Sequence, residues 1–258
     1  MARWIGLSLL AAALPAAASG FDRDLYAALL QQYTREVDDM AQVRVDYRGL
    51  REEPRWRRLV EGLETCDLET LRTREQRMAF WIDAYNVLAI ETVVRAEPKS
   101  SIRDVGNFLF PVWKRKVARI GGKERSLDEI EHAILRPMGD PRIHGAIVCA
   151  SLSCPPLRRE PYRPATLDAQ LDHNARVWLS DPRKGLRIDR EEKAVWLSAI
   201  FDWFREDFEA SGGVLAFAEH HAPEAQARWL ARHGAEARVH HLDYDWSLNA
   251  LATGPSAD

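Results

Sequence analysis

The chain has 258 residues, 46% of them hydrophobic, which is enough apolar material for the core of one large domain or two small ones. Its 36 Lys and Arg residues nearly balance its 39 Asp and Glu residues, and the net charge is -3. This balance gives no reason to expect nucleic acid or an anionic membrane surface as a partner.

The first twenty residues have the pattern of a secretory signal peptide. Arg3 supplies a short positive region, residues 4–14 are apolar, and residues 16–18 are small enough for a cleavage site. The alternative is an N-terminal anchor helix, but the apolar run is shorter than the roughly 20 residues that a membrane span needs. We therefore expect a mature chain that begins between Ser19 and Phe21. Such a protein is secreted, or periplasmic in a bacterium, and has no stable membrane span after cleavage.

Helical periodicity dominates the next hundred residues. It predicts surface helices over residues 21–39 and 54–63, with an extended stretch at 43–47 between them. Thr73-Arg-Glu-Gln76 is a capping box. It opens a helix from Met78 to Val94 that is hydrophobic nearly all round, so we expect this helix to be buried at the centre of the fold.

Asp83 and Asn86 lie three residues apart on one face of that buried helix. Buried polar groups need hydrogen-bond partners. These two side chains therefore either brace neighbouring backbone or line a substrate-binding site.

The second half of the chain alternates hairpins and helices. A glycine turn at 121–122 predicts a hairpin over 114–125, and Ser126 with Glu129 forms a second capping box for a helix ending at Arg136. The remaining elements are expected to be a strand at 143–148, helices at 165–179, 200–208, 214–221 and 225–232, a hairpin from 186–189 and 194–197, and a strand at 239–242. This pattern predicts a helix-rich α+β fold with a small, mostly antiparallel sheet. We expect one domain over residues 21–252 and a disordered tail at 253–258.

The expected strand at 143–148 leads directly to Cys149 and then to a polar loop that holds Ser151, Ser153 and Cys154. A strand that delivers a thiol to such a loop is a common way to build a reactive or metal-binding site. Cys149 is the preferred nucleophile because it stands at the strand exit, whereas Cys154 precedes a proline that restricts its backbone.

A candidate base lies in the preceding helix. Asp128 and His132 are four residues apart and so stack on one face, where a carboxylate fixes the tautomer of an imidazole. Together with Cys149 as nucleophile, this pair would complete a Cys-His-Asp arrangement, with Glu131 as a second candidate acid. The alternative is an ordinary surface ion pair, worth about 0.3–0.5 kcal/mol.

His144 is the other candidate base. Side chains alternate along a strand, so positions 144 and 149 of a regular strand face opposite sides. A bulge at Gly145 would change this. His144 therefore ranks below His132 as the partner of Cys149 and is expected to support the substrate-binding loop.

The cysteines allow two other interpretations. In an oxidising compartment Cys149 and Cys154 can form a local disulfide, which leaves at least one free thiol, and Cys66 is expected to be a packing residue. Alternatively, the two cysteines with His132 and His144 would make a tetrahedral zinc site, although their spacing matches no common finger. The preferred interpretation includes no metal and no cofactor.

The chain has nine tryptophans, a number that raises carbohydrate stacking as an option. Five fall at core-like positions and are expected to be mostly packing residues: Trp81, Trp178, Trp196, Trp203 and Trp246. Trp56 and Trp113 lie among basic residues and are expected to be exposed. The sequence lacks the G-x-S-x-G, P-loop, H-E-x-x-H and G-x-G-x-x-G motifs, which disfavours the classes that use them.

Several segments together resemble the domain-of-unknown-function family numbered 547. They are FWIDAYN at 80–86, SLDEIEH at 126–132, DPRIH through CASLSCP at 140–155, IFDWF at 200–204 and LDYDWSLN at 242–249. The resemblance covers residues 40–250, and Asp83 stands where the family usually has asparagine. It implies a shared site at Glu131, His132, His144, Cys149 and Cys154. By analogy we also expect a relationship to papain-like or transglutaminase-like thiol enzymes, although a shared fold does not establish function.

The sequence therefore favours a secreted or periplasmic cysteine-dependent hydrolase or acyltransferase acting on a small-molecule or peptide-like amide substrate. Cys149 would attack, His132 would act as base, and Asp128 or Glu131 would orient it. Asn86 and Ser151 would position the substrate. The alternatives are a non-catalytic module that binds an envelope protein or glycan, with Cys149 joined to Cys154, and a redox or metal site.

Overall fold

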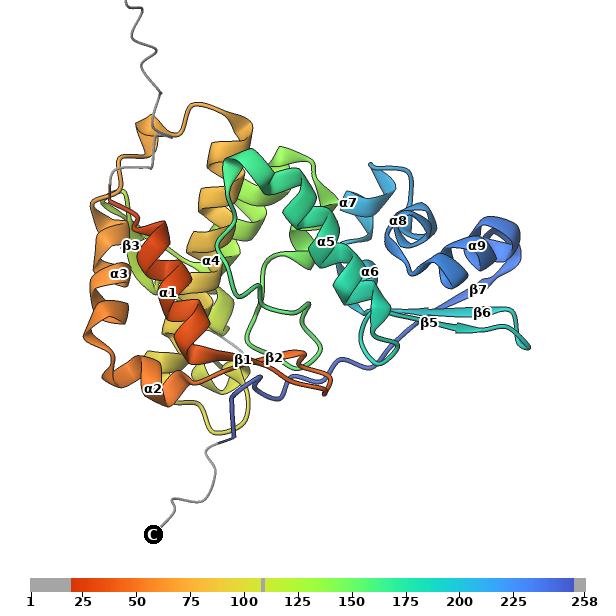
Figure 1. Ribbon diagram of the computed structural model, residues 1–258, viewed down its shortest axis with the longest axis horizontal. Helices are drawn as coiled ribbons and strands as arrows, with labels where there is room; N and C mark the ends of the chain where they lie inside the picture. The colour runs from red at the N-terminus through yellow and green to blue at the C-terminus, as the bar shows by residue number, and fades with distance from the viewer. Residues whose placement is uncertain (1–19, 108–109, 253–258) are drawn as a thin grey trace, which may run out of the picture.

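The computed structural model describes residues 20–107 and 110–252 (Figure 1). Apart from Gly20, the expected signal peptide lies outside the described residues, as does the expected tail at 253–258. Within the described ranges, no helix has the length and hydropathy needed to cross a membrane.

The protein is a helix-rich α+β structure. Its helices are α1 (Arg23–Tyr33), α2 (Tyr47–Glu52), α3 (Pro54–Glu64), α4 (Arg74–Ala96), α5 (Leu167–Ser180), α6 (Ile200–Trp203), α7 (Arg205–Glu209), α8 (Val214–His221) and α9 (Glu224–His233). Its strands are β1 (Thr34–Glu36), β2 (Val43–Val45), β3 (Ala118–Ile120), β4 (Lys123–Arg125), β5 (Leu186–Asp189), β6 (Ala194–Leu197) and β7 (Arg238–His241). Short 3-10 helices lie between them, including η2 (Ile102–Val105), η3 (Val112–Lys114) and η6 (Pro141–Gly145), and η4 (Glu129–Leu135) is a π-helix.

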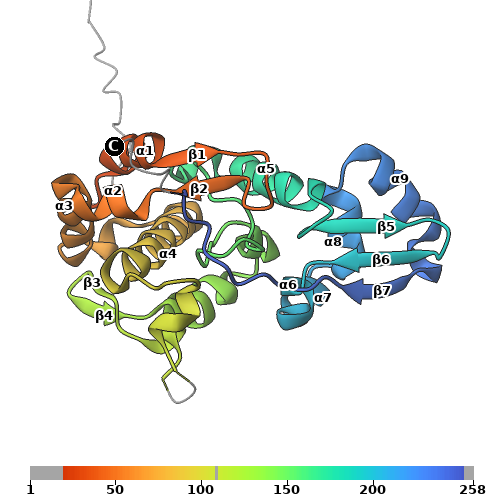
Figure 2. The ribbon, with the colours of Figure 1, turned by 90° about the horizontal axis from the view of Figure 1, so that it is seen from below.

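Helix α4 is the buried central helix that the sequence predicts. Thr73 Oγ1 accepts from the backbone N–H of Gln76 at 3.1 Å, and the Gln76 side chain accepts from the Thr73 N–H at 3.0 Å. The capping box therefore fixes the start of the helix. Every residue from Met78 to Val94 is buried, and α1, α2 and α3 lie around the helix (Figure 2).

The strands form three small sheets rather than the one expected. β1 pairs with β2 and β3 with β4, each antiparallel, and the third sheet has the order β5-β6-β7. Within this third sheet β5 and β6 form the predicted hairpin, whereas β7 runs parallel to β6. The fold class is confirmed, while the single sheet is corrected to three separate ones.

The strand predicted at 143–148 is wrong. Asp140 caps the start of η6 by accepting from the Arg142 N–H, and Pro141 occupies the first helical position, where its fixed φ suits a helix. The following residues, 146–148, pair with no strand in the part of the chain that the structure describes. Their backbone groups instead bond to the side chain of Asn86, so a buried apolar run need not be a strand.

Buried apolar residues fall into two clusters. The larger surrounds α4 and reaches Leu171, and the smaller begins at Ala175 and gathers the hairpin β5-β6 with α6 to α9. After β7 the chain returns from the smaller cluster toward β2 (Figure 2). On this return path Leu248 pairs with Ser151 and Ala250 with Val45. The return places residues 244–246 beside the cysteine loop.

Two tryptophan predictions are wrong. Trp56 is 3% exposed, because its indole N–H donates to Glu91 inside the core. Trp203, expected in the core, is 48% exposed. Trp113 and Trp246 are half-buried and Trp178 is fully buried. Trp113, Trp203 and Trp246 therefore keep ring surface that is accessible to solvent.

Candidate functional site

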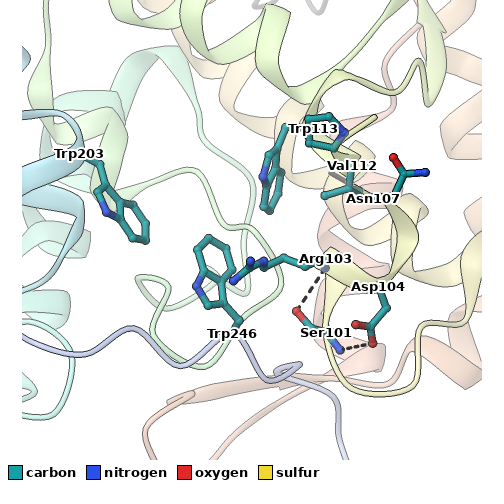
Figure 3. Close-up of a pocket in the computed structure, with 10 residues that line it drawn as sticks. Ser101, Arg103, Asp104, Asn107, Val112, Trp113, Trp203 and Trp246 are labelled. Carbon is teal, nitrogen blue, oxygen red and sulfur yellow. Dashed lines mark hydrogen bonds between the residues drawn. The ribbon is translucent and has the colours of Figure 1, made fainter. Parts of the chain in front are cut away.

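A cavity of about 180 Å³ lies between the π-helix η4, the cysteine loop and the C-terminal return segment. Six of the predicted catalytic or substrate-binding residues line it: Asp128, Glu131, His132, His144, Cys149 and Cys154. It shares Trp113, Trp203 and Trp246 with an adjoining open groove of about 940 Å³, shown in Figure 3. The fold thus brings together residues that are distant in sequence.

Asn86 of α4 holds the cysteine loop in place. Its side-chain NH₂ donates to the carbonyl of Ala146 at 3.0 Å, and its side-chain oxygen accepts from the Val148 N–H at 2.8 Å. The side chain thereby substitutes for a neighbouring strand. Asn86 does not line the cavity. Of the two roles that the sequence left open, the structure shows the bracing of backbone.

Ala150 follows Cys149 with a φ of 62°, a conformation that costs a non-glycine residue about 1 kcal/mol or more. Its carbonyl accepts from the Asn249 N–H at 3.0 Å, so the return segment maintains this conformation. The result is a tight loop in which both cysteines line the cavity, although Cys154 is only 2% exposed.

Cys149 and Cys154 are joined in a disulfide, with their Cα atoms 6.3 Å apart. The Tyr244 hydroxyl lies 3.3 Å from the Cys149 sulfur and 3.1 Å from the Cys154 sulfur. Ser151 does not line the cavity itself, but its hydroxyl lies 3.1 Å from both the Cys149 sulfur and the Tyr244 oxygen. The hydroxyls of Tyr244 and Ser151 are therefore both in contact with the disulfide sulfurs. The third cysteine, Cys66, is buried and free, and burial raises its pKa to about 11.

His132 is engaged on both ring nitrogens. Arg136 can only donate, and its guanidinium lies 2.8 Å from His132 Nδ1, so Nδ1 accepts. In the neutral ring the proton is then on Nε2, which lies 3.9 Å from Asp128 Oδ1. The predicted Asp128–His132 pair is present. The ring nevertheless has no free lone pair with which to take a proton from Cys149.

His144 is the better-built histidine of the cavity. Its side chain is fully buried, and its Nε2 lies 2.7 Å from Asp207 Oδ2. The ring stacks on Phe204 with centroids 4.2 Å apart. Burial lowers the pKa of His144, so the neutral ring donates from Nε2 to Asp207. Because 141–145 is helical and 146–148 is irregular, the strand argument that ranked His144 below His132 does not apply.

Glu131 faces the unprotonated side of that ring. Its Oε1 lies 4.0 Å from His144 Nδ1, which has no hydrogen-bond partner among residues 20–107 and 110–252, and its Oε2 accepts from the Tyr85 hydroxyl at 3.4 Å. Burial raises the pKa of Glu131 to about 7. A carboxyl with a pKa near neutrality suits general acid–base chemistry.

Asp83, proposed from the sequence as a substrate-binding residue, lies away from the cavity. It is 1% exposed and accepts from the Tyr162 N–H at 3.0 Å, with the Arg23 guanidinium 3.5 Å from its other oxygen. Burial raises its pKa to about 7. Its role here is to brace the chain around Tyr162.

Sequence reasoning missed Asp207 and Tyr244 as parts of the site. Nothing in the sequence marked Asp207, which is one of several charged residues in the helix predicted at 200–208. Tyr244 lies in the LDYDWSLN segment, whose resemblance to the family was the available signal. Trp203 and Trp246 were assigned to the core although both line the cavity.

The zinc interpretation gains no support from the geometry. Within the described part of the chain, Asp172, His220 and His221 alone bring three ligand atoms within 4.8 Å of one another. Arg142 already donates to Asp172 Oδ1 at 2.8 Å, so a cation there would compete with a guanidinium.

Residues 68–179 match the model of one family, described as "Protein of unknown function, DUF547". No curated protein and no solved structure matches the chain. The match contains α4, the π-helix η4 and the cysteine loop, whereas Asp207 and Tyr244 lie beyond it. The chain therefore contains a DUF547 domain, which spans residues 68–179.

Proposed function

We propose that the cavity is the active site of a cysteine-dependent hydrolase or acyltransferase that acts on amide or peptide-like substrates once Cys149 is reduced. One observation carries this proposal: Cys149 lines the same small cavity as Glu131, whose pKa is raised to about 7. A thiol and a base of suitable pKa in one concave site are the minimum for nucleophilic catalysis.

In this proposal the thiolate of Cys149 attacks the substrate carbonyl carbon. The Glu131 carboxylate takes the thiol proton and then returns it to the leaving amine, whose bond to the carbonyl carbon breaks. The acyl thioester is resolved by water in a hydrolase or by a second amine in a transferase. The Tyr244 hydroxyl, 3.3 Å from the sulfur, is the group placed to donate to the developing oxyanion.

The tautomer of His132 favours Glu131 rather than His132 as the base. His132 and Asp128 then form part of the cavity wall. The hydrogen-bonded pair of His144 and Asp207 lies beside Glu131 and orients its carboxyl. The neutral His144 ring directs its unprotonated Nδ1 toward Glu131 at 4.0 Å, while Nε2 remains bonded to ionised Asp207. This is the orienting role that a third group plays in a catalytic triad.

The disulfide sets a condition on this chemistry. A dithiol reductant must first exchange with the Cys149–Cys154 bond, which yields two protein thiols and the oxidised reductant. We also propose, from the signal peptide pattern, a secreted or periplasmic location. Disulfides persist in such compartments. The second candidate function, a non-catalytic binding module with a structural disulfide, is therefore favoured by the S–S bond itself.

Thiol labelling separates the two candidates. Native protein is treated with iodoacetamide before and after mild reduction, and the modified cysteines are identified by peptide mass spectrometry. The active-site proposal expects Cys149 to become alkylated rapidly after reduction, while buried Cys66 remains unmodified as an internal control.

Activity is then measured on a panel of amide and thioester substrates. Cys154→Ser leaves Cys149 without its disulfide partner, so turnover and a trapped acyl-enzyme on Cys149 should no longer require reductant. Cys149→Ser should give neither. If reduced protein and Cys154→Ser both alkylate no faster than an unperturbed thiol and form no acyl-enzyme, the binding module is the correct function.

A further inference from the structure

The wall of the cavity that adjoins the cysteine loop at Tyr244 is built of aromatic rings. Tyr244 and Trp246 have centroids 4.5 Å apart, Trp203 lies 4.8 Å from Tyr244, and Trp113 lies 5.9 Å from Trp246. Figure 3 shows the three indoles around an open space. They come from η3, α6 and the C-terminal return segment, so the fold assembles this wall from separate elements.

The ring faces are not equally available. Trp246 lies between the Arg103 guanidinium, 5.1 Å from its centroid, and the indole of Trp203, which stacks on it at 5.6 Å and 15°. Trp246 is therefore covered and acts as a support. Trp203 is 48% exposed and Trp113 is half-buried, so these two present π-surface to a ligand.

The same cavity carries acidic side chains. Asp128 and Glu131 line it, with their side chains 34% and 14% exposed, and none of its described lining residues is Lys or Arg. Arg136, which contacts His132 of the lining, is bound to Asp207 at 2.7 Å and 2.9 Å. Its charge is thus already paired, and the lining of the cavity has an excess of negative charge.

We propose that this cavity binds a substituted ammonium group of the ligand, with Trp203 and Trp113 supplying ring faces and Asp128 supplying the opposite charge. Aromatic rings combined with a carboxylate make the arrangement that recognises alkylammonium ions. The remainder of the ligand would extend into the open groove, whose volume of about 940 Å³ is in the range of ligand sites. The inference names the substrate class of the proposed enzyme and in that sense rests on the proposed function.

A glycan is the competing ligand, because sugars also stack on indoles. Trp246 is covered by Arg103 and Trp203, so only Trp203 and Trp113 offer ring surface to either ligand. The acidic lining gives no advantage to a neutral sugar but favours a cation. This charge favours the ammonium group, and sugar binding is an outcome of the test.

The test compares choline with 3,3-dimethyl-1-butanol, which has the same shape with a carbon in place of the charged nitrogen. Binding to the full mature chain is measured by calorimetry and tryptophan fluorescence at low ionic strength. Choline should bind at least about tenfold more tightly than its neutral isostere. Trp203→Ala and Asp128→Asn should each weaken choline binding about fivefold or more.

Trp229→Phe, an indole on α9 outside the cavity, is the matched control and should leave choline affinity unchanged. Equal binding of choline and the isostere, or binding of chitooligosaccharide with no binding of choline, would overturn the inference. The measurements are repeated on Cys149→Ser, which cannot form an acyl-enzyme. Failure of choline binding then rejects the ammonium site, while failure of Cys149 labelling rejects the enzyme.

Discussion

Asp207 of α7 lies 2.7 Å from Nε2 of the fully buried His144, and its two oxygens also bind Arg136. The hydrogen bond from His144, assisted by Arg136, holds the pKa of Asp207 well below its usual value. One carboxylate therefore fixes the His144 tautomer and also neutralises the charge of Arg136. This contact links the DUF547 domain to the C-terminal part of the chain.

Asp207→Asn should destabilise the protein by roughly 2 kcal/mol, because it removes charge-assisted hydrogen bonds to two partners. The pKa of His144 should fall further below its usual value, since Asp207 is the group that raises it. Denaturant unfolding measures the first effect and NMR titration of the His144 ring the second. Asp202→Asn is the control: Asp202 pairs with Arg205 at the surface, so its loss should cost at most about 1 kcal/mol. Equal losses in both variants would contradict the proposed role of Asp207.

Asn86→Ala should cost roughly 2–4 kcal/mol, because it leaves the carbonyl of Ala146 and the N–H of Val148 buried without their partner. We also expect faster proteolysis of the cysteine loop, which measures its local order. Thr92→Val in the same helix is the control. The Thr92 hydroxyl donates to the Leu88 carbonyl of the preceding turn and braces no other segment among the described residues, so this variant should be much milder.

Most element positions were predictable because local chemistry fixes them. The capping boxes at Thr73 and Ser126 both form as predicted. The hairpin of β5 and β6 has the predicted bounds, and α8 begins and ends where the hydrophobic period indicated. In each case the determining interactions lie within a few residues along the chain.

The predictions that depended on distant partners were the ones that failed. The apolar run before Cys149 looked like a strand, and only the presence of Asn86, more than fifty residues earlier, shows why it is not one. The i,i+4 spacing of Asp128 and His132 indicated a pair but not the Arg136 that occupies His132 Nδ1. The aromatic wall likewise depends on the return of the C-terminal segment, which no local pattern encodes.

Reduction of the Cys149–Cys154 bond should lower the unfolding free energy by roughly 2 kcal/mol, the chain-entropy value for so short a loop. Guanidinium unfolding with and without a phosphine reductant measures this change. The double variant Cys149→Ser/Cys154→Ser retains Cys66 and should not respond to the reductant. An identical response of wild type and double variant would show that the native sulfurs are not bonded.

The titration of Glu131 should make the protein less stable as pH rises. Its folded pKa of about 7 lies above the usual 4.5, so between these values the folded state keeps a proton that the unfolded chain has released. The unfolding free energy therefore falls from about pH 4.5 to about pH 7 and no further. Glu131→Gln lacks this titration. Its unfolding free energy should therefore rise relative to that of wild type across that window, by at most about 3 kcal/mol.

Glu129→Gln provides a control of opposite sign on the same π-helix. Glu129 is hydrogen-bonded to Lys116 and to the Ser126 N–H, which lowers its pKa, so its stabilising contribution is present above the ordinary pKa and lost in acid. Relative to wild type, this variant should lose stability as pH rises toward about 4.5 and then stay constant, whereas Glu131→Gln gains between about pH 4.5 and pH 7. Unfolding curves collected from pH 2 to pH 8 measure both differences. If the Glu131→Gln difference does not change with pH, the pKa of Glu131 is not raised, and the carboxyl is then ill-suited to act as the base for Cys149.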